Sequence, residues 1–160
     1  MDTLLGIYLN DQLAMGLAWR ELARRAARGN RGTEFEVPLR EVASAIAEDV
    51  RTFRGIMQAV PVRANPVKAG IALAAERLGR LKPNGRLTSY SPLSRFWELE
   101  ALAMGIEGKK ILWTTLRDAA HLGNRLADVD FDALLVRADR QRDLLEPARV
   151  RAGEEAFAGG

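Results

Sequence analysis

The chain has 160 residues, of which 48% are hydrophobic and 28% are charged, and its formal net charge is +3. It has no cysteine and one histidine, which excludes a disulfide framework, a thiolate metal site and a cysteine nucleophile. The large apolar fraction argues against disorder, and the length suits a single domain over residues 1–160. Ala and Leu far outnumber Val and Ile, and no segment alternates strictly between apolar and polar residues. We therefore expect helices and no strands.

Two long helices come first in the chain. Apolar residues recur at helical spacing from Leu4 to Leu22, and the turn formers at 29–32 end this segment. A second apolar stripe runs from Leu39 to Val60 and stops at Pro61. Because a short loop joins the two segments, we expect them to pack as antiparallel neighbours.

A long connection follows, and two more long helices complete the chain. Asn65 and Pro66 start a short helix inside the connection, and Ser91 with Pro92 opens a long one. Asp130 or Asp132 starts the last helix, whose end at 152–160 is predicted to fray. The predicted fold is all-α, a four-helix bundle with one long crossover that holds a short additional helix. The predicted helices lie near residues 2–28, 37–60, 66–82, 92–121 and 131–157.

Acidic residues interrupt the apolar stripes of the long helices. Asp11 lies on the first stripe and Asp49 on the second, while Glu100 and Glu107 share a face of the fourth predicted helix. Either of these two glutamates can be the central acid. A buried carboxylate must meet a metal, an arginine or a hydrogen-bond donor, or take up a proton. The sequence therefore predicts a polar cluster in the interior.

This arrangement of helices and acids resembles the ferritin-like superfamily. Members of that superfamily typically hold two metal ions with acids from all four helices, and two helices add a histidine three residues after the acid. The comparable pairs here are Asp49 with Thr52 and Asp139 with Arg142, so both histidines are replaced. The planar fork of an arginine suits bidentate pairing with a carboxylate, which favours an internal ion-pair network with no metal and no cofactor. The residues of this predicted network are Asp11, Asp49, Thr52, Glu100, Glu107, Asp139 and Arg142.

The leading functional interpretation is a non-enzymatic, cytoplasmic bundle that acts through self-assembly or partner binding. The main alternative is a carboxylate-only metal-binding protein or di-iron oxidoreductase that uses iron or manganese. A homodimer is predicted because apolar residues wrap widely around the first and fourth predicted helices. The residues that carry this prediction are Leu13, Leu17, Trp19, Leu99, Leu102, Ile106 and Trp113.

Three further features of the sequence carry weaker signals. Basic residues dominate the crossover, and a second alternative is that they bind nucleic acid or an anionic surface. We favour a solvated outer face, and expect no nucleic-acid partner and no membrane span. His121 is interpreted as a residue at a helix C-terminus, and Gly105 and Gly108 as points of close helix packing. The candidate anion-binding residues are Arg63, Lys68, Arg77, Arg80, Lys82 and Arg86.

Overall fold

The computed structural model describes residues 3–60 and 90–158, and all regular structure in those ranges is helical. The all-α prediction is therefore confirmed for the described residues. The predicted helix near 66–82 and the six candidate anion-binding residues of the crossover lie outside them. No helix in these two ranges is long and apolar enough to cross a lipid bilayer. The four long helices are α1 (Thr3–Gly29), α2 (Glu36–Ala59), α4 (Pro92–Thr114) and α6 (Phe131–Phe157).

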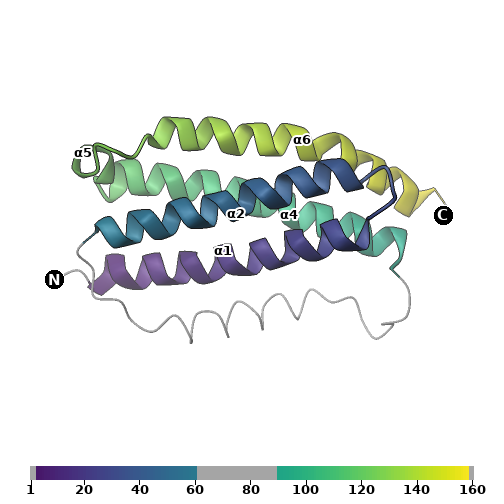
Figure 1. The fold of residues 1–160 in the computed structure, drawn as a ribbon, viewed down its shortest axis with the longest axis horizontal. Helices are drawn as coiled ribbons and strands as arrows, with labels where there is room; N and C mark the ends of the chain where they lie inside the picture. The colour runs from purple at the N-terminus through teal and green to yellow at the C-terminus, as the bar shows by residue number, and fades with distance from the viewer. Residues whose placement is uncertain (1–2, 61–89, 159–160) are drawn as a thin grey trace.

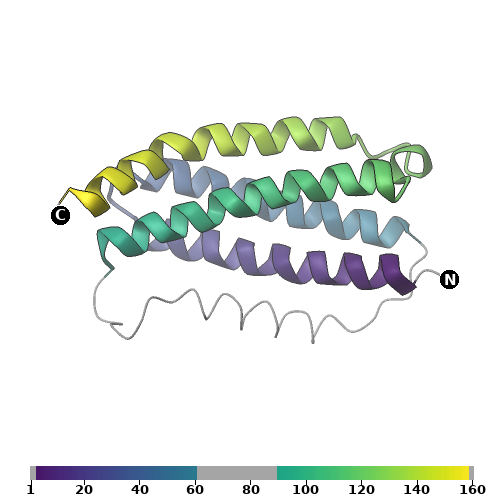
Figure 2. The ribbon, with the colours of Figure 1, turned by 180° about the vertical axis from the view of Figure 1, so that it is seen from behind.

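The long helices form two antiparallel hairpins that lie side by side (Figure 1). One hairpin is α1 with α2, and the other is α4 with α6. Further contacts join α1 to α4 and α2 to α6. Around the molecule the helices therefore follow one another in the order α1, α2, α6, α4. Helices α2 and α4 run in the same direction, so α2 ends and α4 begins at opposite ends of the molecule (Figure 2).

The starts of the helices in the second hairpin follow from the local sequence. The side-chain oxygen of Ser91 accepts a hydrogen bond from the backbone N–H of Ser94 at 3.1 Å, and Pro92 follows it in the first turn. The carboxylate of Asp130 accepts in the same way from the N–H of Ala133 at 2.9 Å, which decides between the two predicted caps. Each cap satisfies a backbone donor that the first helical turn leaves without a partner.

The connection between α4 and α6 is more structured than the sequence predicts. Helix α4 passes into a π-helical turn, Thr115–Ala119, and a one-turn helix α5 follows at Leu122–Arg125. Between them His121 adopts the left-handed conformation with φ of 54°, and its N–H donates to the carbonyl of Asp118. His121 thus ends the helical run, as predicted, and its side chain is exposed.

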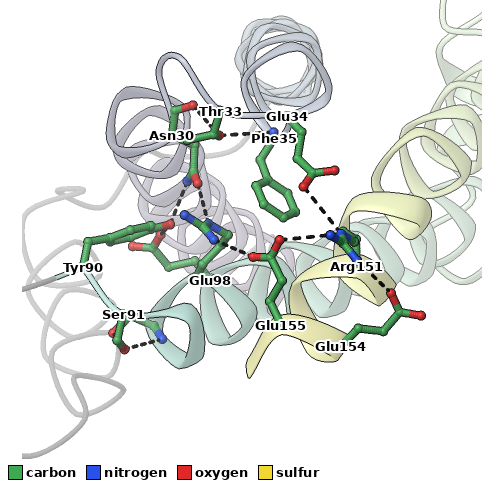
Figure 3. A network of polar contacts seen from close by, with 12 residues as sticks. Asn30, Thr33, Glu34, Phe35, Tyr90, Ser91, Glu98, Arg151, Glu154 and Glu155 are labelled. Carbon is green, nitrogen blue, oxygen red and sulfur yellow. Dashed lines mark hydrogen bonds and ion pairs between the residues drawn. The ribbon is translucent and has the colours of Figure 1, made fainter. Parts of the chain in front are cut away.

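Polar contacts tie the α1–α2 turn to the start of α4 and the end of α6 (Figure 3). The fully buried amide of Asn30 donates to the hydroxyl of Tyr90 at 2.7 Å and accepts from Nε of Arg95 at 2.7 Å. Arg95 also pairs with Glu155 at 2.9 Å. We call Asn30, Tyr90, Arg95 and Glu155 the end clamp. Burial and a hydrogen bond to Glu98 raise the pKa of the Tyr90 phenol, so it stays a neutral member of the clamp.

The end clamp accounts for a difference from the predicted frayed tail. Helix α6 continues to Phe157, because Glu155 is held by Arg95 and the Phe157 ring packs edge-on against Phe96 at 5.4 Å between centroids. Gly153 is buried, and a Cβ there would lie 3.0 Å from the Phe96 ring. The last turns of α6 are therefore part of the packed molecule.

Gly105 brings α4 into close contact with α1, as the sequence predicts, whereas Gly108 does not. A Cβ at Gly105 would lie 1.4 Å from Nε1 of Trp19, whose N–H donates to the carbonyl of Ala101 at 2.9 Å. A Cβ at Gly108 would meet no atom within 4 Å. The interpretation of Gly108 as a packing glycine is wrong, because its position is open.

The two glycines provide a matched test of this packing. Gly105→Ala is expected to lower the free energy of unfolding by about 1–3 kcal/mol, because the indole of Trp19 must leave its site. Gly108→Ala is the control and is expected to raise it by up to about 1 kcal/mol through helix propensity. Urea unfolding followed by circular dichroism measures both. Equal stability of the two variants would contradict the close approach.

Candidate functional site

A layer of polar side chains crosses the apolar interior between α2, α4 and α6. Asp49 on α2 and Gln141 on α6 are each 3% exposed, and the side chain of Lys109 on α4 is 13% exposed. Arg137, one turn before Gln141 on α6, reaches the same place. We call Asp49, Lys109, Arg137 and Gln141 the polar layer. The buried apolar residues form two clusters, and the polar layer lies where they meet.

The contacts of the polar layer converge on the carboxylate of Asp49. The ammonium of Lys109 donates to Oδ2 of Asp49 and to the amide oxygen of Gln141. The amide nitrogen of Gln141 donates to the same Oδ2 at 2.8 Å. Nη2 of Arg137 lies 2.5 Å from Oδ1 of Asp49 as an ion pair. Three helices are thus joined through one carboxylate.

Arg137 connects the polar layer to the surface. Its Nη1 donates to Glu48 at 3.0 Å and its Nη2 to the hydroxyl of Thr52 at 3.2 Å. Glu48 is largely exposed. With Glu48 included, two carboxylates face two cations, so the cluster is formally neutral. This balance meets the requirement that buried charges be paired.

The electrostatics of the layer do not suit a metal ion. Burial lowers the pKa of Lys109 and the charge of Arg137 lowers it further, whereas Asp49 opposes both effects. A divalent cation at Asp49 would lie beside this ammonium and compete with it for the carboxylate. Among residues 3–60 and 90–158, no group of three or more His, Asp or Glu side chains is arranged to hold a metal. The residues present therefore do not fit a carboxylate-bridged metal centre.

Three of the predicted network residues lie on the outside of the molecule. Glu107 and Asp139 are both more than half exposed, and Lys110 bridges them at 3.4 and 2.7 Å. Asp11 is exposed on α1. The prediction that these three acids face a shared interior is wrong, because each lies on the solvent side of its helix stripe.

Two further members of the predicted network lie on an ion-pair seam between α4 and α6. Arg142 pairs with Glu146, and Arg149 joins Glu146 at 2.7 Å to Glu100 at 3.2 Å. Hydrogen bonds from Arg149 and then Arg142 hold the pKa of Glu146 at about 2. Glu100 is partly buried on this seam and does not reach Asp49. The inward arginine is Arg137, so the prediction that Arg142 fills this role is wrong.

Lys109 was not among the predicted site residues, although its spacing from the buried residues of α4 indicates an inward position. The inner stripe of α4 advances by alternating steps of three and four residues, and Lys109 occupies the position between Ile106 and Trp113. The buried apolar residues of this stripe are Leu99, Leu102, Ile106 and Trp113. This is the spacing of a stripe that faces a helical core. The same rule applied to α2 and α6 places Asp49 and Gln141 on their inner stripes. A lysine at such a position requires a buried acid opposite it.

A cavity of about 320 Å³ lies beside the polar layer, between α1, α2 and α4. Gly16 on α1 and Gly105 and Gly108 on α4 are among its lining residues, so α1 and α4 present little side-chain volume there. Trp19 and Trp113 supply aromatic walls. Three more lining residues are exposed and mark the mouth of the cavity. These residues are Met15, Met104 and Ile111.

The chain matches no protein-family model, and comparisons with curated proteins and with solved structures gave no match.

Removal of the central carboxylate tests the polar layer. Asp49→Ala is expected to lower the free energy of unfolding by about 3–5 kcal/mol, because Lys109 and Arg137 are left without their shared counter-ion. Asp139→Ala removes an exposed partner of Lys110 and is expected to cost no more than about 1 kcal/mol. Chemical denaturation of both variants gives the two values. A small loss in Asp49→Ala would show that the layer is not a coupled network.

Proposed function

We propose that this chain is a ferritin-like four-helix bundle that works by binding and not by catalysis. The directions of its helices support this topology, since two antiparallel hairpins with α2 and α4 parallel require one long crossover. Asp49 occupies the second-helix position where the superfamily carries a metal-binding acid, and Thr52 stands in the histidine position.

The observation that carries the proposal is the pairing of Asp49 with Lys109, Arg137 and Gln141. An ammonium and a guanidinium supply the positive charge that metal ions supply in the superfamily. A layer of this kind contributes little net stability, because desolvation offsets the attraction. We infer that its role is to fix the register of α2, α4 and α6, as a polar residue does in the core of a coiled coil.

We further propose that the binding partner is a second copy of the chain. The residues that first suggested a dimer do not form such a surface, because most are buried within one copy and Leu17 and Trp19 are partly buried. A different set on the same two helices is exposed. On α4 the exposed apolar residues are spaced four and seven apart and share one face, which we call the outer stripe. The outer stripe consists of Leu93, Trp97, Met104 and Ile111, and Met15 of α1 lies next to it at the cavity mouth.

A metal assay tests the absence of a metal centre. Untagged protein, loaded with ferrous iron or Mn²⁺ and then desalted, is expected to retain far less than one ion per chain. Elemental analysis by mass spectrometry gives the ratio, and Asp139→Ala serves as a control for surface binding. Stoichiometric metal that disappears in Asp49→Asn would overturn the proposal in favour of the metal-binding alternative.

Analytical ultracentrifugation tests self-association. The full chain is expected to sediment as a dimer, and Ile111→Lys to shift it to a monomer without loss of helical circular dichroism, because a charge enters an apolar contact. Val150→Lys alters an exposed apolar residue of α6, and we expect it to remain dimeric. A wild-type chain that stays monomeric at all measurable concentrations would eliminate the dimer.

A further inference from the structure

The mouth of the cavity and the outer stripe form one surface. Met104 and Ile111 belong to both, and Met15 of α1 completes the mouth. With Leu93 and Trp97, the apolar residues of this surface are 43% to 68% exposed. At about 200 Å² for a large side chain, they expose roughly 500 Å² per copy. A standard interface buries about 800 Å² per partner, of which somewhat more than half is apolar, so this surface supplies the apolar share that a dimer needs.

The spacing of the outer stripe is self-complementary. Trp97 precedes Met104 by seven residues and Ile111 follows it by seven, so each lies about 10 Å from Met104 along the axis of α4. Dimers of identical chains most often have a two-fold axis, which pairs one surface with itself. If that axis crosses α4 at Met104 and the two α4 helices run antiparallel, Trp97 of each copy lies opposite Ile111 of the other.

An open position next to Ile111 has room for the indole. Gly108 lies one turn before Ile111 and lines the cavity, and a Cβ there would meet no atom of the described residues within 4 Å. In the antiparallel pairing, Trp97 of the second copy comes to the level of Ile111, beside the open space at Gly108. The largest side chain of the stripe thus meets its emptiest position, as a knob meets a hole.

A parallel pairing of the two α4 helices fits this surface less well. It sets each residue against its own copy, so the two Trp97 indoles meet at one level, about 16 Å along the helix from Gly108. The cavity mouth then has no indole opposite it. The acids that border the stripe oppose neither pairing, because Glu100 and Glu107 are each paired with a cation of the same copy.

We propose that two copies pair through antiparallel α4 helices about Met104, and that Trp97 of each copy closes the cavity mouth of the other beside Gly108. The wall of the cavity is therefore incomplete in one copy and is completed by a residue of the second. This inference rests on the proposed self-association and adds its orientation and its register. The cavity becomes an internal feature of the dimer.

Disulfide crosslinking tests the register, because the chain has no cysteine of its own. A disulfide forms only where two Cβ atoms lie about 3.5–4.5 Å apart. The double variant Trp97→Cys/Ile111→Cys and each single variant are oxidised with copper phenanthroline, and covalent dimers are measured by non-reducing electrophoresis. We expect the double variant to crosslink at least about ten times faster than either single variant, because antiparallel pairing sets each cysteine opposite the other position.

Two controls accompany these variants. Met104→Cys keeps Trp97, lies on the proposed axis and is expected to crosslink with itself. Val150→Cys, on an exposed position of α6, gives the background of random collisions. Rapid crosslinking of Trp97→Cys or Ile111→Cys alone would show a parallel pairing and overturn the proposal.

Ultracentrifugation of the same samples separates this inference from the proposed self-association. A chain that is dimeric but crosslinks at none of these positions would overturn the register and leave the dimer standing. A chain that is monomeric would overturn both.

The open position at Gly108 is tested with Trp97 left in place. The ring of Gly108→Phe occupies the space that the indole requires, so the dimer dissociation constant is expected to rise at least about tenfold. Gly55→Phe is the matched control, because Gly55 is an exposed glycine of α2 at which a Cβ also meets no described atom within 4 Å. It is expected to leave the constant unchanged. An unchanged constant in Gly108→Phe would overturn the proposal.

Discussion

The ion pair between Asp49 and Lys109 is the constraint on which the interior of this molecule depends. Each charge is acceptable inside an apolar core only because the other is present, so α2 and α4 must meet at one register. Gln141 extends the same requirement to α6. The apolar contacts on either side are not directional, whereas the polar layer needs its donors and acceptors to face one another. We therefore infer that the main physical effect of the polar layer is to select one register of α2, α4 and α6.

Helix positions and caps could be predicted from local sequence, because turn formers and capping side chains act within a few residues. Ser91, Asp130 and the break after Gly29 are examples. The polar layer could be predicted only in part. Asp49 lies on a clear apolar stripe, but on α4 the face predicted to be internal was that of Glu100 and Glu107, and Glu107 is exposed. The error arises because α4 is apolar on more than one face.

Other features depend on contacts between distant segments and leave little trace in the local sequence. In the sequence, Asn30 is typical of an exposed turn. In the structure it is fully buried and links Tyr90 with Arg95. The partners of Arg142 also depend on how α4 and α6 are rotated about their axes. Glu107 and Lys109 are two residues apart and lie on nearly opposite sides of α4, so the rotation of the helix decides which of them points inward, and only the assembled core determines that rotation.

The end clamp gives the molecule two unequal ends. At the clamped end the turn of one hairpin is held to the open end of the other by the hydrogen bonds of Asn30 and by the ion pair of Glu34 with Arg151. Toward the opposite end the described packing is an apolar cluster around Phe53 and Trp113. Apolar contacts are less directional than hydrogen bonds, so the clamped end restricts the relative position of the two hairpins more tightly than the opposite end does.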